Sequence, residues 1–181
     1  VIADEMDISP GNLYYHFHSK DEIVNALFAE YEKEIESLLT APGSRPRGTE
    51  DIWLFLHLLF EIIWKYRFFY RDINDLLTRN RLVETHFQRI LAQKEATAVK
   101  VCQGLAASGV LTATPAEIRA LATNMTVVAT FWLSFEHASR PRGAPDIGRG
   151  VYQVMSLAAP FMEGKERALL EKLSIEYVSE H

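Results

Sequence analysis

The chain has 181 residues, of which 48% are hydrophobic and 24% are charged, and its formal net charge is −5. This length accommodates one domain, or a small domain joined to a larger one, and it needs no disulfide or structural metal to fold. The single cysteine, Cys102, excludes an internal disulfide and a cysteine-rich zinc site. The longest apolar stretch, 52–64, is too short to span a bilayer. No charged and apolar leader opens the chain, so we expect a soluble, cytoplasmic protein with no membrane partner.

The N-terminal part of the chain predicts two short helices and a longer one. Residues 2–6 have the pattern of a helix already under way, so we expect that upstream residues are missing. Ser9 and Pro10 supply an N-cap and a first helical residue, which predicts a short second helix. A capping box at 19–22 opens the third helix, and apolar residues at helical spacing extend it to about Thr40.

Residues 41–48, dense in proline and glycine, are the one clear linker. The segments beyond it have helical spacing and recognisable ends. The expected helices cover 50–66, 71–78, 81–107, 115–137, 147–162 and 165–179. Their expected N-caps are Thr49, Thr114 and Asp146, and the expected stops are Gly109 and Gly164.

No segment alternates between apolar and polar residues with period two, so the chain is predicted to be all-α. The expected helix at 50–66 is apolar nearly all round, which predicts a buried, central position.

The segment 2–17 has the layout of a helix-turn-helix. On its second helix, Leu13 and Phe17 share the face that can pack on the first helix, while Gly11 and Tyr15 point the opposite way. A helix-turn-helix needs this arrangement, because its second helix must present residues to the edges of DNA bases.

The series Leu13, Tyr14, His16, Phe17 and Lys20 resembles the N-terminal domain of the TetR (tetracycline-repressor) family. The resemblance covers residues 2–27, and the helical layout of the remaining chain fits the ligand-binding and dimerisation domain of that family. Asp7 is a departure, since the family usually has a glycine in this turn. Aspartate tolerates left-handed backbone geometry, so we expect the turn to form.

The resemblance implies two domains and a function. Residues 1–40 would be the helix-turn-helix domain, without its first helix, and 49–181 the C-terminal ligand-binding and dimerisation domain. The protein is then expected to be a bacterial transcriptional regulator, a homodimer that binds palindromic double-stranded DNA. We expect it to repress transcription and to be released by a small apolar or aromatic effector. An alternative is a helical homodimer that binds small molecules and uses its helix-turn-helix for protein contacts.

The resemblance also implies which residues contact DNA. The positions near base edges are Ser9, Pro10, Gly11, Asn12 and Tyr15, and the positions near phosphates are Tyr14, His16 and Lys20. The side-chain chemistry agrees, because asparagine pairs with adenine and a lysine at a helix start lies beside amides suited to phosphate. The charge is less favourable, because residues 1–40 contain two lysines and nine acidic residues, which weakens attraction to DNA.

The aromatic residues of the C-terminal part suggest a cavity wall, although any one of them also fits a plain hydrophobic core. An aromatic wall with a few polar groups suits an apolar ligand. The candidate ligand-binding residues are Trp53, His57, Phe60, Trp64, Asn124, Phe131 and Phe135.

Two helices, at 115–137 and 147–162, have more apolar surface than one core needs, which suggests that they also form a dimer interface. In the TetR family the last two major helices pair with their copies in the dimer. The candidate interface residues are Met125, Val128, Trp132, Val151, Met155 and Ala158.

An enzyme is not expected, because the sequence has no glycine-rich phosphate loop, serine nucleophile elbow or zinc-protease motif. His57 and Glu61 have the spacing of a helical metal pair, but a hydrogen-bonded pair is the simpler interpretation. Cys102 lies on a mostly apolar helix and is expected to be an inert core thiol. We therefore predict no catalytic residues, no metal and no cofactor.

Overall fold

The computed structural model describes residues 19–40, 48–141, 143 and 146–178, and of the last range the side chains up to Leu173. The predicted helix-turn-helix segment and seven of its eight candidate DNA contacts lie outside these residues; Lys20 alone lies within them. The described residues form helices joined by short turns, with no strand among them. This confirms the predicted all-α class.

The longer helices are α3 (Lys20–Thr40), α4 (Thr49–Lys65), α7 (Arg81–Ala107), α8 (Pro115–Ser139), α9 (Ile147–Ala158) and α10 (Gly164–Val178). Two short helices, α5 (Arg67–Arg71) and α6 (Ile73–Arg79), connect α4 to α7, and a 3-10 turn, η1 (Ala159–Phe161), follows α9.

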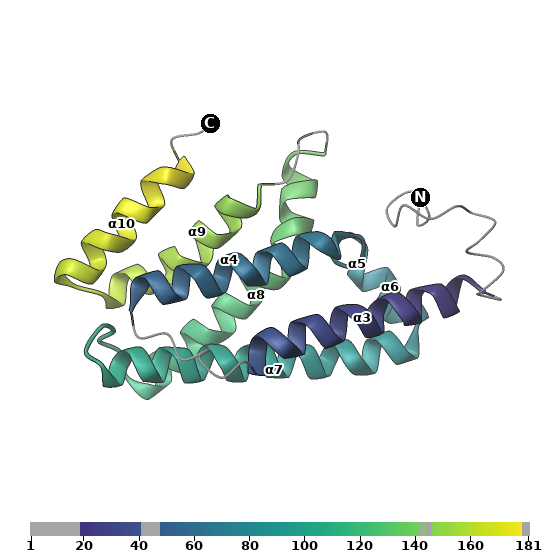
Figure 1. The fold of residues 1–181 in the computed structure, drawn as a ribbon, viewed down its shortest axis with the longest axis horizontal. Helices are drawn as coiled ribbons and strands as arrows, with labels where there is room; N and C mark the ends of the chain where they lie inside the picture. Colours follow the sequence, from purple (N-terminus) through teal and green to yellow (C-terminus); the bar gives the residue numbers. More distant parts are fainter. Residues whose placement is uncertain (1–18, 41–47, 142, 144–145, 179–181) are drawn as a thin grey trace.

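The long helix α7 lies along one side of the molecule, with α3 packed beside it (Figure 1). Helix α4 packs against α9, and α10 lies next to α9 at the far side of the bundle. Helix α8 runs obliquely behind α4 and packs on both α7 and α9, so it joins the two halves. By length and composition alone α8 is also long enough to cross a membrane, but these contacts are those of a core helix.

Most of the predicted helix ends are confirmed. Thr114 and Glu117 form a complete capping box before α8, and the Asp146 side chain accepts a hydrogen bond from the Arg149 amide at the start of α9. The stop after α7 is Gly109, which has a φ of 77° that favours glycine. Ser19 accepts a hydrogen bond from the Glu22 amide over 3.1 Å, as its place in the predicted capping box requires.

The N-cap prediction for Thr49 is wrong. Thr49 is the first residue of α4, and its Oγ1 donates a hydrogen bond of 2.6 Å to Glu166 Oε2 on α10. The same carboxylate oxygen accepts from the Thr49 amide over 3.4 Å. The start of α4 is therefore capped from a distant helix, which no local sequence pattern can reveal.

Helix α4 is also less buried than its composition predicts. Leu54 and Leu58 are 51% and 40% exposed, because the bundle covers only one side of the helix. The predicted helix at 71–78 corresponds to α6, which begins at Ile73, and the short helix α5 before it was not predicted. The predicted helix at 147–162 ends at Ala158, where the 3-10 turn containing Pro160 begins.

Helices α4, α8 and α9 meet closely at Gly150. A Cβ atom on this glycine would lie 2.7 Å from Trp132 Cδ1 and 2.9 Å from Phe60 Cζ, and closer still to Phe60 Cε1. Real Cβ atoms do not approach rings so closely, so only glycine allows α9 this contact.

Candidate functional site

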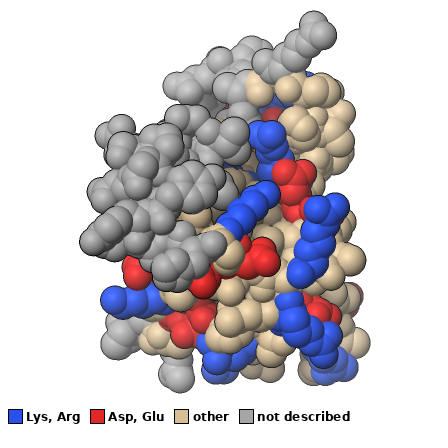
Figure 2. All heavy atoms as spheres, turned by 90° about the vertical axis from the view of Figure 1, so that its right-hand side faces the viewer, with Lys and Arg blue, Asp and Glu red and all other residues tan. Residues whose placement is uncertain are grey.

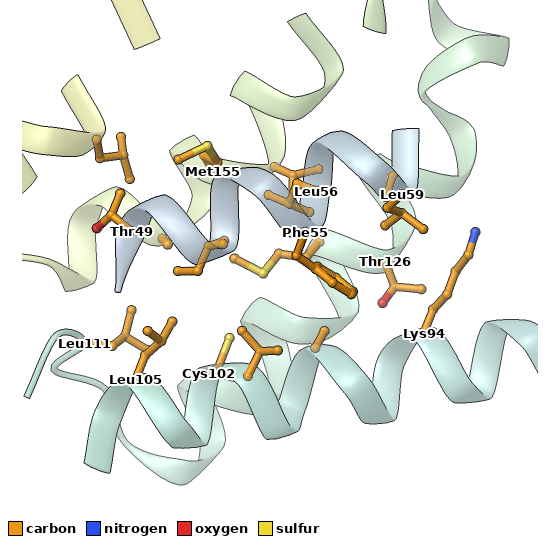
Figure 3. A pocket seen from close by; sticks show the side chains of 18 of the residues that line it. Thr49, Phe55, Leu56, Leu59, Lys94, Cys102, Leu105, Leu111, Thr126 and Met155 are labelled. Atoms are coloured by element: carbon orange, nitrogen blue, oxygen red, sulfur yellow. The ribbon is translucent and has the colours of Figure 1, made fainter. Parts of the chain in front are cut away.

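A cavity lined by described residues lies between α4 and α7, and α8 and α9 complete its walls (Figure 3). It comprises about 770 Å³ of space between atoms, part of it open to solvent. Further wall residues come from the end of α3, the turn after α7 and helix α10. Apolar cavities between the helices of a bundle are places where proteins bind small molecules.

The walls of the cavity are almost entirely apolar. Leu56 and Phe55 of α4 face Val101 and Cys102 of α7, and Met155 of α9 closes one side. Burial raises the pKa of the Cys102 thiol to about 11, so this cysteine is neutral at ordinary pH. Such walls suit an apolar molecule.

Polar groups lie at the two ends of the cavity. Thr49, bonded to Glu166, marks one end, and Lys94 and Thr126 mark the other. The Thr126 hydroxyl donates to the carbonyl oxygen of Ala122 over 2.9 Å. The cavity is thus elongated along α4, with a carboxylate near one end and the stem of Lys94 at the other.

Lys94 is only 5% exposed, an unusual environment for a lysine. Its Nζ donates a hydrogen bond of 3.0 Å to Tyr70 Oη and lies 5.1 Å from the centre of that ring. The Tyr70 hydroxyl in turn pairs with that of Tyr31 on α3. Burial lowers the pKa of Lys94 to about 7 and raises the pKa of both tyrosines.

The sequence analysis missed Lys94, although a signal was present. The buried residues of α7 recur at helical spacing, and Lys94 occupies one position of this register four residues after Ile90. A lone lysine on the buried face of a long amphipathic helix is a detectable anomaly.

The candidate ligand-binding residues named from the sequence lie outside the cavity wall. Phe60 is buried against Gly150, and Phe131 and Phe135 are 38% and 57% exposed on α8. Asn124 is exposed as well, and Trp64 is half-buried beneath the guanidinium group of Arg67.

Trp53 and His57 form a stacked pair, with ring centres 5.3 Å apart, on the half-exposed side of α4. His57 Nε2 lies 3.5 Å from Glu61 Oε1, so the two side chains are neighbours along the helix, but they are partly exposed and do not form a buried hydrogen-bonded pair. No group of three or more metal-binding side chains occurs among the described residues.

The candidate dimer residues divide between the cavity and the core. Met125, Met155 and Ala158 line the cavity. Val151 is fully buried, Val128 is half-buried, and Trp132 Nε1 donates to the Asp146 carbonyl oxygen over 3.0 Å. The exposed face of α8 instead carries Val127, Phe131 and Phe135, which are 50%, 38% and 57% exposed.

Lys20 is exposed at the first residue of α3, as a phosphate contact requires. On the face of the molecule in Figure 2, the basic and acidic side chains of the described residues are intermixed. Two pairs of this kind are Arg79 with Asp75 and Arg81 with Glu84, each 2.8 Å apart.

Helix α3 is anchored to the other helices by ion pairs. Glu32 contacts His86 and Arg89 of α7 over 2.8 and 2.7 Å. Lys65 donates to Glu34 over 2.5 Å and holds the pKa of that carboxyl below its ordinary value. Leu39, near the end of the same helix, lines the cavity. One rigid element therefore connects the start of the described chain with the cavity.

An all-α protein with an apolar cavity and an N-terminal helix-turn-helix pattern is typical of a ligand-responsive DNA-binding regulator. The comparisons with known proteins identify the family. A family model described as "Bacterial transcriptional repressor" matches residues 30–170, and one described as "Bacterial regulatory proteins, tetR family" matches residues 1–27. The chain belongs to the TetR family of transcriptional regulators.

A solved structure supports the same assignment. The chain is 32% identical to a TetR-family transcriptional regulator from Marinobacter aquaeolei VT8, with a TM-score of 0.79. The similarity covers 97% of this chain and 86% of that one. A comparison with curated proteins gave no match. The family assignment identifies the protein as a DNA-binding transcriptional regulator.

Proposed function

We propose that the protein is a homodimeric repressor that binds palindromic DNA and is released when a small apolar molecule enters the cavity between α4 and α7. The observation that carries the proposal is the apolar cavity itself, which one chain builds from the helices around α4 and α7. Residues 1–40 act as the DNA-binding domain and residues 49–181 as the ligand-binding and dimerisation domain.

The exposed face of α8 supports the proposed dimer. Val127, Phe131 and Phe135 lie four residues apart and form one continuous apolar stripe. Exposed apolar stripes of this kind mark interaction surfaces. In a symmetric dimer each stripe packs on its copy, which sets the two helix-turn-helix units one DNA turn apart.

Helix α3 supports a route from the ligand to the DNA. Its first residue, Lys20, adjoins the helix-turn-helix segment, and Leu39 near its other end lines the cavity. A ligand that displaces Leu39 moves the helix as a unit and changes the spacing of the two DNA-binding units. Release then follows from the difference in DNA affinity between the two arrangements.

The test begins with selection of DNA fragments that the full chain binds, followed by titration of one fragment at several salt concentrations. We expect steep loss of affinity with salt, because lysine–phosphate contacts release counterions. Lys20→Ala should weaken cognate and scrambled DNA equally, and Tyr15→Ala should cost about 1–3 kcal/mol on cognate DNA alone.

The alternative function, in which the helix-turn-helix contacts another protein, gives a different result. No DNA fragment would then be enriched in the selection. Residual DNA binding would not distinguish cognate from scrambled sequence, and Tyr15→Ala would have no effect on it.

A further inference from the structure

Lys94 lines one end of the proposed effector cavity with its stem, and its Nζ carries a charge that no described residue neutralises. Among the described residues Lys94 forms no ion pair, and its Nζ donates a hydrogen bond to Tyr70. An ammonium group has three N–H donors, and Nζ is directed toward Tyr70 at the end of the cavity, so two donors remain for a ligand that draws this flexible side chain inward. Burial of a charge without a counter-charge is costly, and a bound anion would remove that cost.

The neighbours of Lys94 do not supply this counter-charge. Tyr70 of α5 and Tyr31 of α3 keep neutral hydroxyls well beyond pH 10, because burial raises the pKa of both. Leu59 of α4 and Thr126 of α8, which line the same end of the cavity, do not titrate. Of the described residues that line this end of the cavity, Lys94 is therefore the one that carries a charge.

We propose that the effector is an elongated monocarboxylic acid whose carboxylate accepts hydrogen bonds from Lys94 and whose apolar body lies along α4. This inference rests on the proposed function and assigns a chemical class to its ligand. The body would contact Phe55, Leu56 and Val101 and extend toward Thr49.

The length and polarity of the cavity define this class further. The wall residues of α4 run from Thr49 to Leu59, which is about 15 Å at 1.5 Å per residue. The far end is bordered by the Glu166 carboxylate, which bonds Thr49. A second carboxylate on the ligand would meet this like charge, so a monoacid is favoured over a diacid.

The pKa of Lys94 makes acid binding dependent on pH. With a pKa of about 7 in the free protein, the amine is largely charged at pH 6 and largely neutral at pH 8. A bound carboxylate favours the charged form and raises this pKa. Binding above pH 7 must therefore be accompanied by uptake of a proton.

The experiment compares dodecanoate with dodecanol, which has the same apolar chain without the charge, by calorimetric titration of the full-length chain at pH 6.5. Lys94→Met removes the ammonium and keeps the apolar stem. Lys100→Met is the matched control, because Lys100 is an exposed lysine on the same helix. We expect dodecanoate to bind the wild type at least tenfold more tightly than dodecanol. Lys94→Met should abolish that preference, and Lys100→Met should retain it.

A second measurement uses the wild type alone. At pH 8, titration of dodecanoate in buffers of different ionisation enthalpy should show uptake of close to one proton per bound ligand. Dodecanol should show none. This readout stands even if the Lys94 variant folds poorly.

Two results would overturn the inference, and they have different consequences. Equal binding of acid and alcohol without proton uptake would refute the carboxylate assignment and leave the apolar effector cavity intact. Failure of both probes to bind, in a protein that still binds its selected DNA, would refute the elongated apolar ligand as well.

Discussion

The two faces of α8 are both apolar, yet they meet different surroundings. On one face, Met125 and Ala129 line the cavity and Trp132 packs against α9. On the other, Val127, Phe131 and Phe135 lie open at the surface of the single chain. The difference shows that apolar residues on a helix specify burial without specifying which surface covers them. One face is covered by the same chain, and we propose that a second copy covers the other.

The first prediction tests whether the exposed face of α8 is a dimer interface. The double substitution Phe131→Glu, Phe135→Glu places charges in the proposed dimer interface, and truncation or charging of such central aromatics weakens association by about 3 kcal/mol or more. We expect sedimentation to show a monomer at micromolar concentration while the helical content is unchanged.

Leu82→Glu is the control for this experiment, because Leu82 is an exposed apolar residue on α7, away from the stripe. It should leave the dimer intact. A double variant that remains dimeric, or a wild-type protein that is monomeric at this concentration, would refute the proposed interface.

The second prediction tests the close packing of the covered face of α8 against α9. Gly150→Ala adds a Cβ atom that meets the rings of Trp132 and Phe60, so we expect a loss of about 2 kcal/mol in the free energy of unfolding. Gly104→Ala on α7 is the matched control, since nothing lies within 4 Å of its added Cβ. It should stabilise the protein by about 0.5–1 kcal/mol through helix propensity. Chemical denaturation of both variants tests the contrast, and equal effects would contradict the close packing.

The same contrast explains what the sequence could and could not predict. The ends of α7 and α8 follow from local chemistry, since Gly109 and the capping box at Thr114 act within a few residues. Phe131 and Trp132 are adjacent aromatic residues on one helix, and nothing local distinguishes the exposed ring from the buried one. Trp132 is buried because α9 packs on it in the folded chain, and no feature of the sequence near residue 132 reveals that contact.

The cavity illustrates the same limit. Aromatic residues suggested its wall, but the structure builds that wall mainly from aliphatic residues and methionines such as Leu56 and Met155. The contact between Thr49 and Glu166 joins residues 117 positions apart, so it could not be inferred from either segment alone. Lys94 was accessible to sequence reasoning, because its place in the register of α7 needs no tertiary information.

The third prediction concerns the buried amine of Lys94 and how it makes the free energy of unfolding depend on pH. The pKa of Lys94 is about 7 in the folded protein and 10.5 when the residue is free. Between these values the unfolded chain binds more protons than the folded one, so this group makes the free energy of unfolding rise with pH. The slope is at most about 1.4 kcal/mol per pH unit, and it vanishes below pH 7, where both states are protonated.

Lys94→Met removes this contribution. The variant should be more stable than the wild type at pH 7, because the buried charge is gone. The difference in free energy of unfolding between the two proteins, here called the gap, should narrow as the pH rises toward 10. Denaturant titrations of both proteins at half-unit intervals measure the gap directly, since other titrating groups contribute equally to the two. The tyrosines beside Lys94 do not interfere, because burial keeps their hydroxyls protonated throughout this range. A gap that stays constant from pH 7 to 10 would mean that Lys94 is charged in the folded protein throughout this range, contrary to its dry surroundings.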